Sequence, residues 1–440
     1  MICLRKRFGG QAHLFLTAAA LVAIANPAHA ETIAITGGKV IIGDGSAPID
    51  GGTVVIRDGT IVAAGSNVPV PAGARTIDAS GKWVTPGIFA GFSRIGLVEV
   101  NAVDETADGS ANKSGFGAAL DIAPAIDPFR SPIAVNRTAG VTRAVVAPEG
   151  GSGIFAGQGA IADLGADSEP VNKARAFQFA EFGEAGADAS GGSRASNHLH
   201  FRAMLREAQD HAANNDGFDD DLLKKEDARA LQAVLRGEQR LLIHVEGAND
   251  MLRLLDLKRE FPAIKMVFVG VSEGWRVADK LAAAGVPVIA SALNDLPASF
   301  EMLAATQSNI GRMKDAGVKV AIGMINDRDT HQLRYTPQYA GNLVSLQKVP
   351  GATGLSWDEA FAAISSTPAD IMGVGDRYGS LKAGRVGDVV IWDGDPLELY
   401  AAATTVLIDG VEQPLGNRQD RLRDRYANPV EGALPKAYDR

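Results

Sequence analysis

The stretch from Val84 to Arg94, VTPGIFAGFSR, decides the fold of this 440-residue chain. Its extended Val-Thr-Pro-Gly lead precedes an apolar run that is typical of a buried β-strand. Side chains two apart on a strand point the same way, so Phe92 and Arg94 are expected to share one face at the end of that strand. The identity of these two side chains therefore decides what chemistry the strand can support.

Strand-like and helix-like segments alternate after this stretch. Apolar runs such as QRLLIHVEG and KMVFVGVSEGW predict strands, and stretches such as ANDMLRLLDLKREF and WRVADKLAAAG predict helices between them. In the last stretch Val277, Leu281 and Ala284 recur at helical spacing, and Gly285 ends the helix. Repetition of this kind over roughly 290 residues favours an α/β fold of the (β/α)8 TIM type over an open sheet.

Both ends of the chain outside this region are rich in short strands and tight turns. TIAITGGKVIIGDG and GGTVVIRDGTIVAAG lie near the start, and GSLKAGRVGDVVIWDGDP and TTVLIDGVEQP lie near the end. Chain ends commonly meet in a compact fold. We therefore expect residues 31–85 and 380–440 to build one small composite β-sandwich, and residues 86–379 to form the barrel.

Several of these segments resemble the amidohydrolase superfamily in their order and spacing. They are RDGTIVAAG, the VTPG entry to the barrel, GVTRAVVAP, TPADIMGV, GSLKAGRVGDVVIWDGDPLE and VLIDG. The chain after residue 30 is most similar to the exported, imidazolonepropionase-like branch of that superfamily. The resemblance implies a barrel with an accessory sandwich, hydrolysis of carbon–nitrogen bonds in small amides or cyclic amides, and a divalent metal, usually zinc.

The chain departs from the family at the metal ligands. The two histidines that the family carries on its first barrel strand fall at Phe92 and Arg94, and no histidine stands near VFVGVSEG on the sixth. Phenylalanine has no donor atom, and a guanidinium repels a dication. On the eighth strand the family's aspartate falls at Ile325, although Asp327 follows two residues later. The pattern predicts a degenerate site in which most zinc ligands are absent.

His244, in LLIHVEG, is the one retained ligand position that the resemblance gives, on the fifth strand. Glu246 follows on the same strand face. His244 is either a residual ligand or general base with a carboxylate partner, or a neutral histidine hydrogen-bonded to Glu246. Glu181, in FQFAEFG, is a weaker candidate for the fourth strand. His331, in DTHQLR, is a further candidate beside the site.

Three other patterns favour structure over catalysis. His198 and His200 form an HxH in a helical run, where such positions do not share a face. The Gly-rich GGSGIFAGQG lacks the lysine of a phosphate loop and is expected to be a tight loop at the barrel mouth. The polar segment NAVDETADGSANKSGFG, residues 101–117, is either a lid or a simple insertion.

Residues 1–30 have the pattern of a signal peptide. A basic start at Arg5–Arg7, an apolar run at Leu14–Ala25 and the small-x-small site Ala28–Ala30 predict cleavage before Glu31. We expect a periplasmic or secreted protein that has no membrane anchor after cleavage.

Charge and cysteine content narrow the function further. The single cysteine, Cys3, lies in the segment expected to be removed, which excludes disulfides, cysteine–zinc sites and cysteine nucleophiles. Loss of three basic residues takes the formal net charge from −9 to −12. Nucleic acid is therefore an unfavourable partner. A small molecule is the expected partner, and a homo-oligomer is left open.

Two functions fit the sequence. The first is a hydrolase of non-peptide carbon–nitrogen bonds with an altered or metal-poor site. In this hypothesis Arg94 polarises the carbonyl, His244 is the base, Asp327 shuttles a proton, and Glu246 and His331 contact the substrate. The second is a catalytically inactive exported barrel that binds a small, anionic ligand near Arg94.

Overall fold

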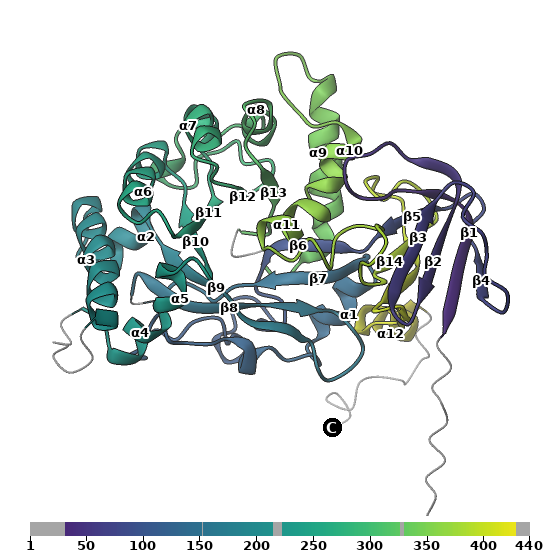
Figure 1. The fold of residues 1–440 in the computed structure, drawn as a ribbon, viewed down its shortest axis with the longest axis horizontal. Coiled ribbons are helices and arrows are strands. Elements are labelled where there is room, and N and C mark those ends of the chain that lie inside the picture. Colours follow the sequence, from purple (N-terminus) through teal and green to yellow (C-terminus); the bar gives the residue numbers. More distant parts are fainter. Residues whose placement is uncertain (1–30, 152, 214–221, 326–329, 428–440) are drawn as a thin grey trace, which may run out of the picture. The chain divides into compact units, whose positions relative to one another are not determined.

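Two eight-stranded sheets organise the residues that the structure describes (Figure 1). The structure is a computed structural model, and it describes residues 31–151, 153–213, 222–325 and 330–427. The expected signal segment and Asp327 lie outside the described residues.

The first sheet forms the wall of a nearly closed barrel. Its order is β13 (Val320–Ile322), β12 (Val288–Ala290), β11 (Lys265–Gly270), β10 (Arg240–Val245), β9 (Val171–Glu181), β8 (Phe155–Asp163), β7 (Val141–Val146) and β6 (Ile88–Ser93). The two outer strands approach each other where the backbone N–H of Met324, just after β13, donates to the carbonyl of Phe92, at an N···O distance of 3.1 Å. The expected eight-stranded barrel is therefore present in outline.

Strand β8 departs from the expected all-parallel barrel, because it runs antiparallel to both β7 and β9. Only residues 147–154 join β7 to β8, and the described residues among them, 147–151 and 153–154, form no helix. A parallel connection needs a crossover of a dozen or more residues, whereas a short loop can join antiparallel strands. The prediction of GGSGIFAGQG as a loop was accordingly wrong from Phe155 onward. Gly159 is needed there because a Cβ would lie 2.0 Å from Cζ of Phe177.

Side chains alternate across the barrel wall with the period of two that strands impose. Leu241, Ile243 and Val245 of β10 belong to the large outer core under the helices, while Leu242 belongs to the inner core of the barrel. In β9, Phe177 and Phe179 lie in the same inner core. His244 and Glu181 are the next inward positions on their strands, so the sequence pattern alone directs both into the barrel.

Helices cover the outside of the barrel strands, and Figure 1 shows α3, α6, α7 and α8 on the outer side of β10–β13. Helix α6 buries Met251, Leu254 and Leu255 along one face and ends with Lys258 and Arg259, which suit the negative end of the helix dipole. The α-helices are α1 (Ser131–Arg137), α2 (Gly183–Asp188), α3 (Arg194–Ala213), α4 (Lys225–Ala230), α5 (Gln232–Leu235), α6 (Ala248–Glu260), α7 (Ala278–Ala283), α8 (Asn309–Asp315), α9 (Thr336–Ser345), α10 (Trp357–Ala362), α11 (Ser366–Ile371) and α12 (Arg418–Ala427). Short 3-10 helices are η1 (Asp104–Thr106), η2 (Ala123–Ala125), η3 (Gly274–Arg276), η4 (Phe300–Met302), η5 (Leu333–Tyr335) and η6 (Leu346–Lys348).

The second sheet joins the two ends of the chain. Its order is β16 (Val411–Glu412), β15 (Ala403–Ile408), β14 (Val389–Trp392), β5 (Trp83–Pro86), β1 (Thr32–Val40), β2 (Ile49–Arg57) and β3 (Thr60–Gly65), and β4 (Arg75–Asp78) pairs with β1. The expected sandwich is thus one continuous hydrogen-bonded sheet in the described residues. Val389 and Ile391 of β14 pack into this sheet's own core, while Val390 and Trp392 pack into the outer core of the barrel. Contacts group all of Glu31–Arg440 into one unit, and the boundaries at residues 85 and 380 stay a prediction.

A buried arginine links the barrel wall to this second sheet. Arg143 of β7 is 1% exposed, and its guanidinium forms two bonds to Asp388, with Nε–Oδ2 and Nη2–Oδ1 distances of 2.7 and 3.1 Å. Nη2 also bonds Asp409 at 2.7 Å, and Nη1 lies 3.4 Å from Asp163. Burial alone lowers the pKa of Arg143, but the surrounding carboxylates outweigh it and raise the pKa above its ordinary value.

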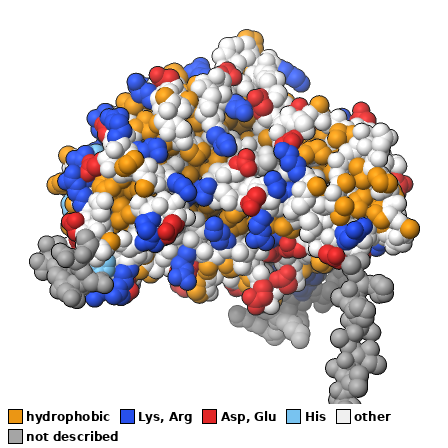
Figure 2. Space-filling view, viewed as in Figure 1, with side chains coloured by type: hydrophobic (Ala, Val, Ile, Leu, Met, Phe, Trp, Pro, Cys, Tyr) orange, Lys and Arg blue, Asp and Glu red, His pale blue; other side chains and the backbone are white. Residues whose placement is uncertain are grey.

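No helix within the described part of the chain is long and apolar enough to cross a membrane. On the face shown in Figure 2, Lys and Arg side chains are scattered among Asp and Glu side chains.

Candidate functional site

A cavity of about 630 Å³ opens at the carboxyl ends of the barrel strands. Active sites of barrels of this kind lie at that end. The lining residues come from the ends of β6, β9 and β10, from the loop after β7, from α2, and from the segment after β13. They are Phe92, Arg94, Glu149, Gly150, Gly151, Phe179, Glu181, Ala185, Asp188, Ala189, His244 and Ile325.

His244 lies between two carboxylates in this cavity. Its Nδ1 is 2.7 Å from Oε2 of Glu181, its partner in the register of β9 and β10, and its Nε2 is 3.1 Å from Oε1 of Glu246. The His244 side chain keeps 25% of its surface exposed, so it reaches the cavity. The predicted contact between His244 and Glu246 is confirmed, and Glu181 is a second partner.

The two carboxylates hold His244 in its charged form. Burial lowers the pKa of the imidazole, but the charges and hydrogen bonds of Glu181 and Glu246 outweigh burial and raise that pKa well above its ordinary value. Both ring nitrogens then carry protons and donate one to each carboxylate. In this charged form His244 is a proton donor rather than a proton acceptor.

Glu246 lies behind His244. It is 2% exposed and is absent from the described lining of the cavity. Its Oε2 accepts a hydrogen bond from the backbone N–H of Ser272 at 2.7 Å, which fixes the carboxylate against the imidazole. A Cβ on Gly270, which has a φ of +93°, would lie 2.3 Å from Oε1 of Glu246. Glycine at the end of β11 thus makes room for this carboxylate.

Phe92 and Arg94 occupy the end of β6 and line the same cavity. The Phe92 ring packs on Phe179, with 5.6 Å between ring centroids, as part of the inner core. Arg94 is 6% exposed, and its backbone N–H donates to the carbonyl of Thr330 at 2.7 Å. The site therefore places Arg94 and His244 around one cavity, as the sequence suggested, although the sequence did not indicate that His244 is charged.

Glu149 is a lining residue that the sequence analysis did not identify. It follows the strand run GVTRAVVAP directly, and its place at a strand's carboxyl end was a usable signal. Its backbone N–H donates to the carbonyl of Gly109 at 2.7 Å, and a Cβ on Gly109 would lie 3.7 Å from Cδ of Arg94. The polar segment 101–117 thus packs against the mouth. Gly150 and Gly151 line the cavity, as expected for the start of the Gly-rich run.

Glu301 lies next to the site without lining the cavity. Its Oε2 accepts from the backbone N–H of Glu184 at 2.8 Å and lies 3.2 Å from Nη2 of Arg194, which also bonds Asp250. Burial is the main cause that raises the pKa of Glu301 to about 6, and the charge of His244 partly opposes it. Nothing in the sequence around Glu301 indicated this position, because it comes from a loop far along the chain.

The remaining predicted residues do not join this group. Asp327 is outside the described residues. His331 is 4% exposed and is not among the described residues that line the cavity; its carbonyl accepts a bond from Nδ2 of Asn136 on α1 at 2.9 Å. His198 and His200 lie on α3, and Nδ1 of His200 contacts the carbonyl of Ser196 at 2.9 Å.

The donor set does not fit the zinc centre that the family implies. Within 31–151, 153–213, 222–325 and 330–427, no group of three or more His, Cys, Asp or Glu side chains is arranged to hold a metal ion. Phe92 and Arg94 stand at the two first-strand positions, and both nitrogens of His244 face carboxylates.

Comparison with known proteins agrees with the observed fold. Residues 211–412 match the sequence model of the amidohydrolase family. An imidazolonepropionase of Chromobacterium violaceum is 28% identical over 211 residues, which cover 47% of this chain and 46% of that protein. These matches support the amidohydrolase superfamily for this chain.

Two further matches extend over more of this chain. The amidohydrolase tasK of Hapsidospora irregularis is 26% identical over 381 residues, which cover 78% of this chain but only 38% of that protein. The matched part thus spans less than half the length of either relative. The crystal structure of an amidohydrolase from Thermotoga maritima superimposes with a TM-score of 0.76 at 22% identity, covering 86% of this chain and 99% of that one.

Proposed function

We propose that this protein hydrolyses a carbon–nitrogen bond in a small amide or cyclic amide, with a site altered from the family pattern. The observation that carries the proposal is the group Glu181–His244–Glu246, of which Glu181 and His244 line the same cavity as Arg94 while Glu246 lies behind the imidazole. The resemblance to an imidazolonepropionase supports a cyclic amide as one substrate class.

The site residues divide the chemistry between them. The guanidinium of Arg94 is a fixed cation that stabilises negative charge developing on a carbonyl oxygen. The imidazolium of His244 donates a proton to the departing nitrogen, and the Glu181 carboxylate accepts the proton of the attacking water. The sequence predicted His244 as the base; because two carboxylates keep it protonated, we assign it the role of acid.

A second candidate is a barrel that binds a ligand without reacting. Phe92 fills a position where the family has a ligand, and both nitrogens of His244 are already engaged. A small anion paired with Arg94 is the expected ligand in that case.

Turnover of a panel of amides, ureas and cyclic amides by the purified protein separates the two. We expect measurable hydrolysis that falls about 10²–10⁴-fold in His244→Asn and in Glu181→Gln. Glu238→Gln is the matched control, because Glu238 is exposed and pairs only with Arg236. Absence of turnover together with saturable binding that Arg94→Ala abolishes would support the binding protein instead.

Metal analysis tests the altered site directly. We expect less than about a tenth of an equivalent of zinc, manganese or iron in the purified protein, even after loading with zinc. A near-stoichiometric metal content would contradict the metal-poor site. The double variant Phe92→His with Arg94→His is expected to raise zinc affinity if only these ligands were lost.

We also propose export to the periplasm, on the pattern of residues 1–30. Mass spectrometry of the protein recovered from a bacterial periplasm should give a chain that starts at Glu31. Recovery of the full-length chain in the cytoplasm would contradict export.

A further inference from the structure

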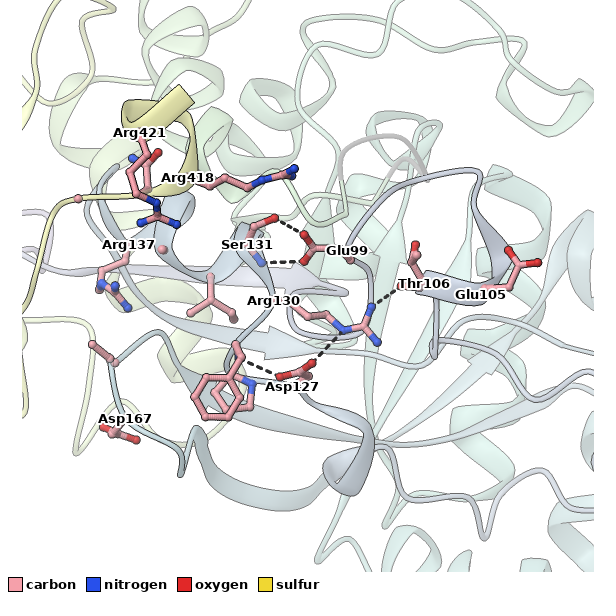
Figure 3. Close-up of a pocket in the computed structure, with 18 residues that line it drawn as sticks. Glu99, Glu105, Thr106, Asp127, Arg130, Ser131, Arg137, Asp167, Arg418 and Arg421 are labelled. Carbon is pink, nitrogen blue, oxygen red and sulfur yellow. Dashed lines mark hydrogen bonds and ion pairs between the residues drawn. The ribbon is translucent and has the colours of Figure 1, made fainter. Parts of the chain in front are cut away.

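A second cavity, of about 710 Å³, lies between α1, α12 and the loops around residues 105, 128 and 166 (Figure 3). It shares no lining residue with the cavity at the barrel mouth. Arg137 of α1 and Arg418 and Arg421 of α12 line it, and Figure 3 shows Arg418 and Arg421 extending from the helix toward the cavity.

Arg137 is a buried cation without a carboxylate partner among the described residues. It is 5% exposed, and its Nε and Nη1 donate to the carbonyls of Pro414 and Leu164 at 3.2 and 2.9 Å. Burial lowers the pKa of Arg137, and no neighbouring charge offsets that effect. Burying an ion without a counter-ion is costly, so this guanidinium is a group whose charge an anionic ligand would neutralise.

The acidic side chains near this cavity are largely occupied elsewhere. Both oxygens of Glu99 accept bonds from Ser131, and Asp127 accepts from the backbone N–H of Phe129 and lies 3.9 Å from Arg130 (Figure 3). Asp167 accepts a bond from the backbone N–H of Glu169 at 2.8 Å.

Arg418 and Arg421, by contrast, form no ion pair with any carboxylate in the described part of the chain. The nearby acids Asp420 and Asp424 form ion pairs with Arg423 of the same helix instead. The cavity thus combines three cations that lack carboxylate partners with three acids that already have donors, Glu99, Asp127 and Asp167. A fourth lining acid, Glu105, is exposed and has no side-chain partner among the described residues.

We propose that this cavity is a binding site for a small ligand with a phosphate or carboxylate group, held by Arg137, Arg418 and Arg421. Guanidinium groups present pairs of N–H donors that match the oxygen spacing of both anions. The volume leaves room for more than the anionic group, so the ligand is a small organic anion. The site is separate from the proposed hydrolytic site, and the two proposals stand or fall independently.

Binding of inorganic phosphate and of succinate to the full protein tests the site, with affinity measured by calorimetry at constant ionic strength. We expect saturable binding of at least one probe, weakened about tenfold in Arg421→Ala and in Arg418→Ala. Arg425→Ala is the matched control, because Arg425 lies on the same helix outside the cavity, and its affinity should match that of the wild-type protein.

Arg137→Lys keeps the charge but loses the fork of donors, and we expect it to bind either probe more weakly while the protein stays folded by circular dichroism. No saturable binding of either probe would overturn the proposal. Equal affinity in Arg418→Ala, Arg421→Ala and Arg425→Ala would overturn it as well, because binding would then not depend on the cavity.

Discussion

Glu181 and His244 are direct partners in the parallel register of β9 and β10, and the carboxylate of one lies 2.7 Å from Nδ1 of the other. The pair is formed by strand geometry, because each residue is the next inward position after an apolar one. This ion pair at the barrel mouth is thus a consequence of sheet register.

The first prediction concerns the protonation of His244. Glu181→Gln removes the nearer charge, so the pKa of the imidazole should fall toward its ordinary value, as followed by NMR titration of the His244 ring. In the wild-type protein the pKa of His244 is raised on folding, so protonation of the ring stabilises the fold. This stabilisation is complete below the unfolded-state pKa near 6.5 and is lost as pH rises through the higher folded-state pKa. A wild-type ring that titrates at or below 6.5 would contradict the doubly bonded imidazolium.

The second prediction concerns the space behind His244. Gly270→Ala should lower the free energy of unfolding by about 2–4 kcal/mol, because the new methyl group meets Glu246 and the backbone has a positive φ. Gly285→Ala is the control: its φ is +61°, but nothing lies within 4 Å of its Cβ position, so the cost should be only about 1 kcal/mol. If urea denaturation gave the two variants equal losses of unfolding free energy, the space beside Glu246 would not be as tight as the structure shows.

The third prediction concerns the link between barrel and second sheet. Arg143→Met should destabilise the protein by about 3–5 kcal/mol, because it leaves the buried carboxylates of Asp163 and Asp388 without their cation. Arg75→Met, which breaks exposed pairs with Glu31 and Glu412, should cost less than about 1 kcal/mol. Denaturant melts that give the two variants the same midpoint would exclude a stabilising role for the buried network.

The fourth prediction concerns pH. A folded-state pKa of about 6 for Glu301, above its ordinary 4.5, means that the folded protein binds the extra proton. The stability that Glu301 contributes is therefore present below about 4.5 and is lost as pH rises through about 6. Glu301→Gln should make the free energy of unfolding less dependent on pH in this window than in the wild-type protein. Identical pH profiles for the wild-type protein and Glu301→Gln would show that a group other than Glu301 titrates in this window.

The barrel strands were predictable because their apolar runs and alternation carry local information. The runs around His244 and Val269 became β10 and β11, and the helix ending at Gly285 became α7. Strand β8 was missed because its glycines suggested a loop, whereas Gly159 is required by the ring of Phe177 from the neighbouring strand. That constraint exists only once the strands are paired.

The candidate site was predictable to the same degree. His244, Glu246, Phe92 and Arg94 follow from position along a strand, and the structure brings three of them to one cavity with Glu246 behind. Glu301 and Arg194 meet across more than a hundred residues through loops and a helix, and no spacing rule connects them. Pairs of this kind depend on tertiary packing, which a single sequence does not display.

Because the partners of Arg143 lie far apart in the sequence, the completion of its network depends on residues that are synthesised late. Arg143 and Asp163 leave the ribosome long before Asp388 and Asp409. Of its three carboxylate partners, the guanidinium of a nascent chain therefore has only the most distant, Asp163 at 3.4 Å, together with the amide oxygen of Asn172 at 2.7 Å. Burial of β7 becomes favourable only after Asp388 and Asp409 have reached the guanidinium of Arg143 and balance its charge. The carboxyl-terminal strands thus act as the closing step of assembly, and a chain released before residue 388 is left with a buried guanidinium that lacks its two nearest carboxylates.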